Sequence, residues 1–99
     1  MPLLYVTEYA GVGFSQIGAE YSAVPLEPPL ADYTVSIPGT SPVFQPTTIL
    51  VRLATDSICS VKIGLSPVAT TTNARMAANQ TEYRGVPQAG FSVSVVPNT

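Results

Sequence analysis

The chain has 99 residues, of which 45% are hydrophobic and 10% are charged, and its formal net charge is -2. The length predicts a single domain with a modest core, and the charged fraction is far below the roughly 25% that is usual in globular domains. The four basic residues form no stripe of positive charge, which argues against a nucleic-acid partner. No apolar run approaches the roughly 20 residues of a membrane span, so we expect no membrane association. No basic segment opens the chain as in a signal peptide, so we expect synthesis in a cytoplasm.

The N-terminal third predicts one clear strand followed by a region with little regular pattern. Leu3–Tyr9 (LLYVTEY) alternates between two faces, as a strand does. Gly11–Gly18 (GVGFSQIG) is predicted to be a glycine-spaced loop, and Glu20–Val24 a short strand or extended segment. Pro25–Leu30 is expected to be polyproline-like, because proline lacks the amide that a central strand needs. Residues 1–32 are therefore predicted either to form an extended arm on a neighbouring subunit or to fold back as long loops.

Residues 33–96 are predicted to form the β core. Short runs of β-branched and aromatic residues recur between turn signals, and none has a sustained helical period. The predicted strands of this region are Tyr33–Ile37, Thr47–Thr55, Ser57–Leu65, Thr81–Val86 and Phe91–Val96. A tight hairpin is expected at Asp56-Ser57, because Asp favours turns. With the N-terminal strands this makes about seven short strands, which predicts an all-β fold over residues 1–99, a compact β-sandwich or barrel with an extended N-terminal region.

The segment between the third and fourth strands of that core is predicted to be irregular. Ser66–Ala74 (SPVATTTNA) is a loop, and Ala74–Gln80 (ARMAANQ) is either a single helical turn or has no regular structure. The loop is small and polar enough to lie flat on another protein, and Arg75 and Met76 are the contacts that we predict there. An exposed Arg and a Met that fills a gap in the core are the alternatives, and the sequence leaves them open.

The residue types needed for most catalysis are missing. The chain has no histidine, which removes the commonest general base and metal ligand and excludes Ser-His-Asp and Cys-His catalysis. Its six carboxylates fall in no recognisable motif, and Gly11–Gly18 lacks the spacing and lysine of a phosphate-binding loop. Cys59, the single cysteine, is expected to be a buried structural thiol. We predict no catalytic residue, no metal site and no cofactor, and hence a protein that is not an enzyme.

The low charge points to a surface that is partly covered by other protein. Tyrosine suits such contacts, because its ring is apolar and its tip is polar. Tyr5 and Tyr9, which share a strand face, and Phe14 are the aromatic residues that we predict at an interface. A homo-oligomer is the expected state, and a monomer with a coat of Ser and Thr is the alternative.

An ordered set of features runs through the second half of the chain. They are Arg52 to Asp56 as Arg-x-x-Thr-Asp, Cys59 in an alternating strand, Gly64, Pro67, Ala69, Thr70, Met76-Ala77-Ala78, Glu82-Tyr83 and Gly85-Val86. In this order and spacing the chain resembles small virion structural proteins of tailed bacteriophages and prophages, over about residues 49–96. The resemblance implies a head decoration or cement component that binds the major capsid protein, other copies of itself, or both. It also implies a place in the phage particle after synthesis in the host cytoplasm.

Two other functions fit the same sequence. A receptor- or glycan-binding module of a tail or head fibre would carry an exposed aromatic patch. A hydrolase that works with carboxylates alone would depend on residues such as Asp56 or Glu82.

Overall fold

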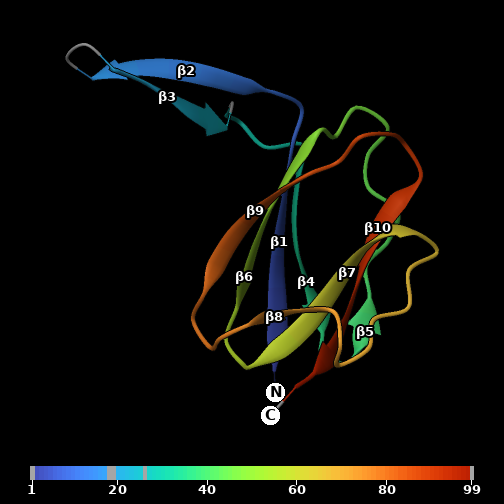
Figure 1. The fold of residues 1–99 in the computed structure, drawn as a ribbon. Coiled ribbons are helices and arrows are strands. Elements are labelled where there is room, and N and C mark those ends of the chain that lie inside the picture. Colours follow the sequence, from blue (N-terminus) through green and yellow to red (C-terminus); the bar gives the residue numbers. More distant parts are fainter. Residues whose placement is uncertain (1, 18–19, 26, 99) are drawn as a thin grey trace.

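The computed structural model is an all-β sandwich in which two four-stranded antiparallel sheets pack together (Figure 1). It describes residues 2–17, 20–25 and 27–98, with only the backbone of residues 13–17 and 20–24. The first sheet has the order β4-β1-β6-β9, with bounds Ala31–Ser36, Leu3–Tyr9, Leu50–Thr55 and Thr81–Gly85. The second has the order β5-β10-β7-β8, with bounds Gly39–Thr40, Phe91–Pro97, Cys59–Leu65 and Ala74–Met76. The predicted all-β sandwich is confirmed, and no helix occurs among these residues.

The core lies between the two sheets and follows the alternation of their strands. On β1, Leu4 and Val6 point inward and are almost fully buried, whereas Tyr5 between them is exposed. The same period of two places Val51 and Leu53 of β6 in the core. The cluster is completed by Val35, Ile37, Phe44, Cys59, Val61, Met76, Val86, Val93 and Val95. Cys59 is the buried thiol that the sequence predicted, and burial raises its pKa above the usual value of a thiol.

The connection at Asp56-Ser57 is not the hairpin that we predicted. β6 pairs with β1 on one side and with β9 on the other, so it has no free edge for β7. The chain instead crosses from the first sheet to the second between Thr55 and Cys59. The Thr55 hydroxyl donates to the Ser57 carbonyl (2.7 Å), which holds the bend. Asp56 lies in a turn, as expected, but this turn connects strands of two different sheets.

The N-terminal region divides into three parts. Leu3–Tyr9 is a central strand of the first sheet, and Ala31 begins the strand β4 beside it. Between them, β2 (Val12–Ile17) and β3 (Glu20–Pro25) form a two-stranded antiparallel hairpin that projects from one end of the sandwich (Figure 1). The predicted loop at Gly11–Gly18 is therefore wrong over Val12–Ile17, because every residue of this stretch pairs with β3 despite the glycine within it. The part of residues 1–32 that can act as an arm is this hairpin.

Residues 66–73 form a loop, as predicted, but the loop lies on its own domain. Ala69 N donates to Ser94 Oγ (3.0 Å), and Asn98 Nδ2 donates to the Thr71 carbonyl (3.2 Å). Ser94 is on the outer face of β10 and is nevertheless buried, because this loop covers it. The loop leads into β8, where we expected a helical turn or no regular structure, and β8 pairs with the start of β7.

Candidate functional site

The five residues predicted to make contacts with a partner differ in their exposure. Tyr5 is exposed on the outer face of the first sheet, and Arg75 is exposed on β8. Met76 is fully buried in the core, so it fills a gap there instead of meeting a partner, because β8 turns it inward against β7. Tyr9 is buried as well, and the side chain of Phe14 lies outside the described residues.

Tyr9 shows why sharing a strand face with Tyr5 did not give it the same exposure. The extended segment before β4 returns along the end of β1, where Leu30 N donates to the Glu8 carbonyl (2.7 Å). This brings Glu27 to the Tyr9 side chain. Burial, followed by the nearby Glu27 carboxylate, raises the pKa of the Tyr9 phenol above its usual value. The two tyrosines therefore do not form a common surface.

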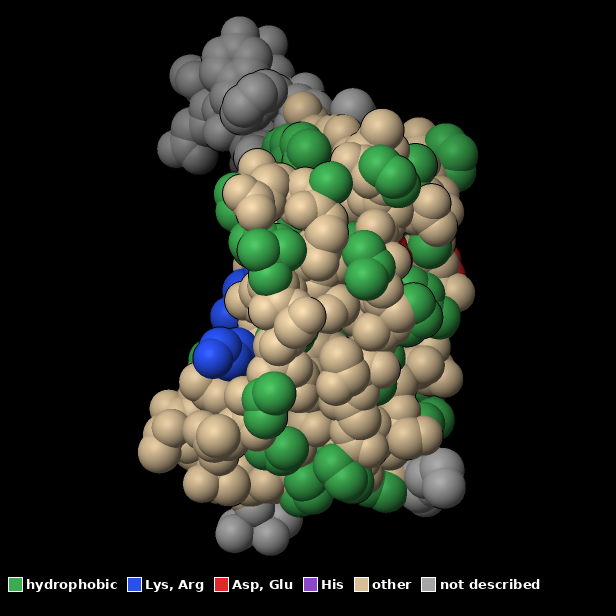
Figure 2. Space-filling model, turned by 90° about the vertical axis from the view of Figure 1, so that its right-hand side faces the viewer, with side chains coloured by type: hydrophobic (Ala, Val, Ile, Leu, Met, Phe, Trp, Pro, Cys, Tyr) green, Lys and Arg blue, Asp and Glu red, His purple; other side chains and the backbone are tan. Residues whose placement is uncertain are grey.

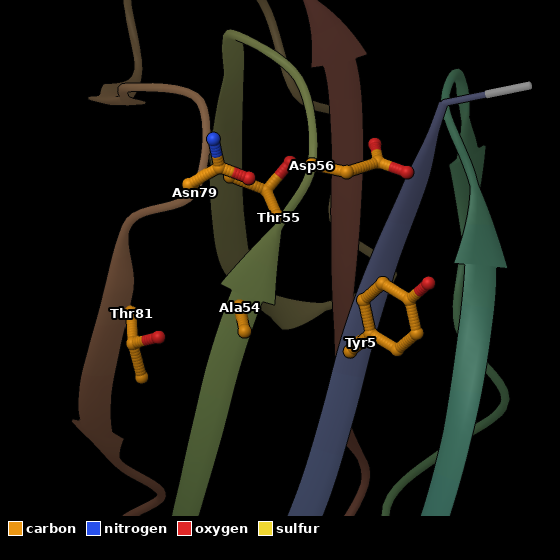
Figure 3. A pocket seen from close by; sticks show the side chains of 6 residues that line it. All are labelled: Tyr5, Ala54, Thr55, Asp56, Asn79 and Thr81. Atoms are coloured by element: carbon orange, nitrogen blue, oxygen red, sulfur yellow. The ribbon is translucent and has the colours of Figure 1, made fainter.

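A hollow on the outer face of the first sheet adjoins Tyr5 (Figure 3). Its volume is about 350 Å³, and it is lined by Tyr5, Ala54, Thr55, Asp56, Asn79 and Thr81. The register places Tyr5, Ala54 and Thr81 side by side on β1, β6 and β9. Asp56 and Asn79 stand at the end of the strands, where β6 and β9 meet their loops. The hollow lies at the end of the sandwich opposite the hairpin.

Asp56 is fixed by the first strand. Its Oδ1 accepts hydrogen bonds from Leu3 N (2.9 Å) and from Ser57 Oγ (3.0 Å). The bond from the Leu3 backbone holds the pKa of this exposed carboxyl below its usual value. Asp56 is therefore ionised at neutral pH and is oriented at the rim of the hollow.

A second surface, which we call the hairpin end, is where β1 leaves the sandwich for the hairpin. Its exposed aliphatic side chains are Val12, Leu30, Val43, Ile49 and Leu65. Hydrogen bonds bring these segments to one end: Ile49 N donates to the Tyr9 carbonyl, and Phe44 N to the carbonyl of Phe91, which pairs with Leu65. On the face that Figure 2 shows, hydrophobic side chains are scattered among mostly uncharged atoms, with basic groups at one edge and a few acidic atoms at the other. This surface was not singled out from the sequence, although its low charge follows from the composition.

Behind the hairpin end lies a buried carboxylate, whose burial was not predicted from the sequence. Glu8 is only 2% exposed, and its Oε1 accepts from Gln45 N and from the Thr48 hydroxyl, both at 2.7 Å. The Tyr33 hydroxyl is also buried, without a hydrogen-bond partner among the described residues. Burial and then the Glu8 carboxylate raise the pKa of Tyr33 well above its usual range. Glu8 thus ties the loop before β6 to the sandwich.

The remaining carboxylates are spread over the molecule. Glu82 accepts a hydrogen bond from Arg84 Nη2 (2.6 Å) and lies against Gln80 at the edge strand β9. Asp32 accepts from the Thr7 hydroxyl at 2.5 Å. Within the described part of the chain, no three His, Cys, Asp or Glu side chains gather as metal ligands would. There is also no helix among those residues that is long and apolar enough to cross a membrane.

The fold and these two surfaces define a small β-sandwich with a projecting hairpin at one end and a hollow at the other. Comparison with family models, with curated proteins and with solved structures gives no match to this chain.

Proposed function

We propose that this chain is a non-enzymatic structural protein of a tailed-bacteriophage particle, a decoration or cement subunit of the head. It attaches through its hairpin end to the major capsid protein and to other copies of itself. The phage origin is supported by the resemblance of residues 49–96 to small virion proteins. The attachment is supported by one observation above all, the hairpin that projects from the sandwich.

A projecting hairpin needs a partner. Among the described residues, β2 and β3 pair only with each other, so each has an unpaired edge. An isolated two-stranded hairpin is marginally stable in water, and an open strand edge is a template for pairing with another chain. Six residues of strand reach about 20 Å, which is long enough to cross onto a neighbouring subunit. The hairpin is therefore suited to become ordered against other protein.

The aliphatic residues at its base support the same contact but are too few to form it alone. Burying a whole Val, Leu or Ile side chain contributes about 1.5–3 kcal/mol, and the five at the hairpin end are already partly buried, between 38% and 62% exposed. Their combined gain is roughly 5 kcal/mol, close to the lower bound of about 4 kcal/mol for the entropy lost on association. A stable attachment needs the hairpin as well, together with repeated contacts in a symmetric shell.

The experiment is co-sedimentation of the full chain with assembled shells of the major capsid protein from the same phage. A variant in which Val12–Pro25 is replaced by a short Gly-Ser linker tests the hairpin. The matched control is Tyr5→Ala, which alters an exposed side chain at the other end. We expect the wild type and the control to sediment with shells, and the hairpin variant to lose at least about 100-fold in affinity, or 2.7 kcal/mol.

A circular dichroism melt of the hairpin variant shows whether the sandwich still folds without residues 12–25. The proposal is wrong if the wild-type chain stays monomeric at high concentration and does not sediment with shells. Attachment that survives removal of the hairpin in a folded variant would overturn the assigned surface.

A further inference from the structure

We propose that the hollow beside Tyr5 is a binding site for a neutral saccharide. The inference does not rest on attachment to a capsid, because the hollow and the hairpin are at opposite ends of the sandwich. A subunit held by its hairpin end would present this hollow away from the surface to which it is attached.

The shape of the site comes from three neighbouring strands. Tyr5 is 45% exposed and its ring forms one wall, with Ala54 beside it on β6 and Thr81 on β9 (Figure 3). Because Ala54 is small, a space remains between the ring and Thr81. The volume of about 350 Å³ lies at the lower end of the roughly 300–1,000 Å³ that is usual for small-molecule sites. A space next to an exposed ring suits the flat apolar C–H face of a sugar.

The rim supplies groups for the hydroxyls of such a ligand. Leu3 N and Ser57 Oγ both donate to Asp56 Oδ1, and no hydrogen bond within the described residues takes up Oδ2. Oδ2 is therefore available to accept from ligand hydroxyls. Asn79 offers both a donor and an acceptor in its side-chain amide, and its backbone is held by a bond from Asn79 N to the Thr55 carbonyl (2.8 Å). Its φ of 64° lies in the left-handed region, which Asn tolerates better than most residues.

The chemistry of this lining disfavours other classes of ligand. A phosphate or carboxylate would meet the negative charge of Asp56, and the described residues that line the hollow include no Lys or Arg. A metal ion would find a single carboxylate. A purely apolar molecule would bury Asp56, Asn79 and Thr81 without partners, which is unfavourable. A neutral molecule with several hydroxyls and one apolar face satisfies all of these groups.

The test is an NMR titration of the ¹⁵N-labelled full chain with glucose, galactose, mannose and N-acetylglucosamine, supported by an array of neutral, sialylated and sulfated oligosaccharides. Few contacts line the site, so we expect a Kd of about 1 mM for a single sugar. The shifted amides should be those of Tyr5, Ala54, Asp56, Asn79 and Thr81. Sialylated and sulfated forms should bind less tightly than their neutral counterparts.

Three variants locate the binding. Tyr5→Ala removes the wall and Ala54→Leu fills the space, and each should weaken binding at least 10-fold. Tyr83→Ala is the matched control, because Tyr83 is similarly exposed on the same sheet face but does not line the hollow. Spectra of all variants report directly whether the sandwich is folded.

The proposal is overturned if no neutral sugar shifts these amides, or if folded Tyr5→Ala and Ala54→Leu variants bind as well as the wild type. Shell attachment is read separately by co-sedimentation. A chain that attaches to shells but ignores sugars contradicts only the saccharide site, and a chain that binds sugars but ignores shells contradicts only the proposed function.

Discussion

The two ends of the sandwich differ in the kind of surface that they present. The hairpin end carries exposed aliphatic side chains and two strand edges that pair with no other described segment. The opposite end carries an exposed tyrosine, a fixed carboxylate and an amide around a small hollow. Aliphatic surface and open edges favour contact with protein, whereas convergent polar groups beside a ring favour a small polar ligand. The proposed attachment surface and the proposed saccharide site thus lie at opposite ends of one small domain.

The largest expected effect concerns the core that supports both ends. Leu53 is fully buried in the middle of the first sheet. Leu53→Ala should lower the free energy of unfolding by about 3 kcal/mol, because it removes buried methyl groups and leaves a cavity. Urea denaturation measures this change. Loss of shell attachment and of sugar binding in equal measure would mark it as an effect on folding, whereas loss at one end alone would contradict a shared core.

A smaller effect is expected for the carboxylate beneath the hairpin end. Glu8→Ala removes the acceptor of Gln45 N and of the Thr48 hydroxyl and should destabilise the protein by about 2 kcal/mol. Glu8→Gln keeps an oxygen at this position and is the control, with an expected loss of less than half as much. Urea denaturation curves of the two variants compare loss of the acceptor oxygen with its retention. Equal losses would contradict the stabilising role assigned to the hydrogen bonds from Gln45 N and Thr48.

Introducing a charge into the aliphatic surface of the hairpin end should weaken association and leave the free energy of unfolding nearly unchanged. Ile49→Lys and Leu65→Lys place a cation on exposed positions of the hairpin end. Each should weaken self-association or shell attachment about 10-fold and change the unfolding free energy by less than about 0.5 kcal/mol. Sedimentation velocity measures the association. Tyr83→Lys, outside that surface, should leave it unchanged, and a similar loss there would remove the distinction between the two ends.

The smallest effect is a pH dependence at the hollow end. The hydrogen bond from Leu3 N lowers the pKa of Asp56 in the folded state below the usual value of an aspartate. The stability that Asp56 contributes is therefore present above the unfolded pKa and is lost as the pH falls through the folded pKa. Thermal melts of the wild type and Asp56→Asn should differ slightly at pH 7, and the difference should shrink as the pH falls below the usual range of an aspartate. A difference that grows on acidification would contradict this assignment.

Several features could be read from local pattern because they depend on residues near one another in the chain. The inward positions of Leu4, Val6 and Cys59 follow from a period of two and a preference for burial. The absence of histidine and the sparse charge are properties of the sequence itself. The candidate sites were less predictable. Tyr5 and Tyr9 look equivalent on one strand, yet a segment about 20 residues away buries only Tyr9.

The sequence by itself determined that this is a β protein, where most of its strands lie and which faces they bury, because alternation is written into consecutive residues. Only the tertiary structure decided which edges pair. In that structure β7 pairs in the second sheet, β2 and β3 pair with each other as a projecting hairpin, and Asp56 and Asn79 lie beside Tyr5. The physical reason is that a strand edge can hydrogen-bond to any compatible neighbour, and the choice among neighbours is made by the packing of the whole domain.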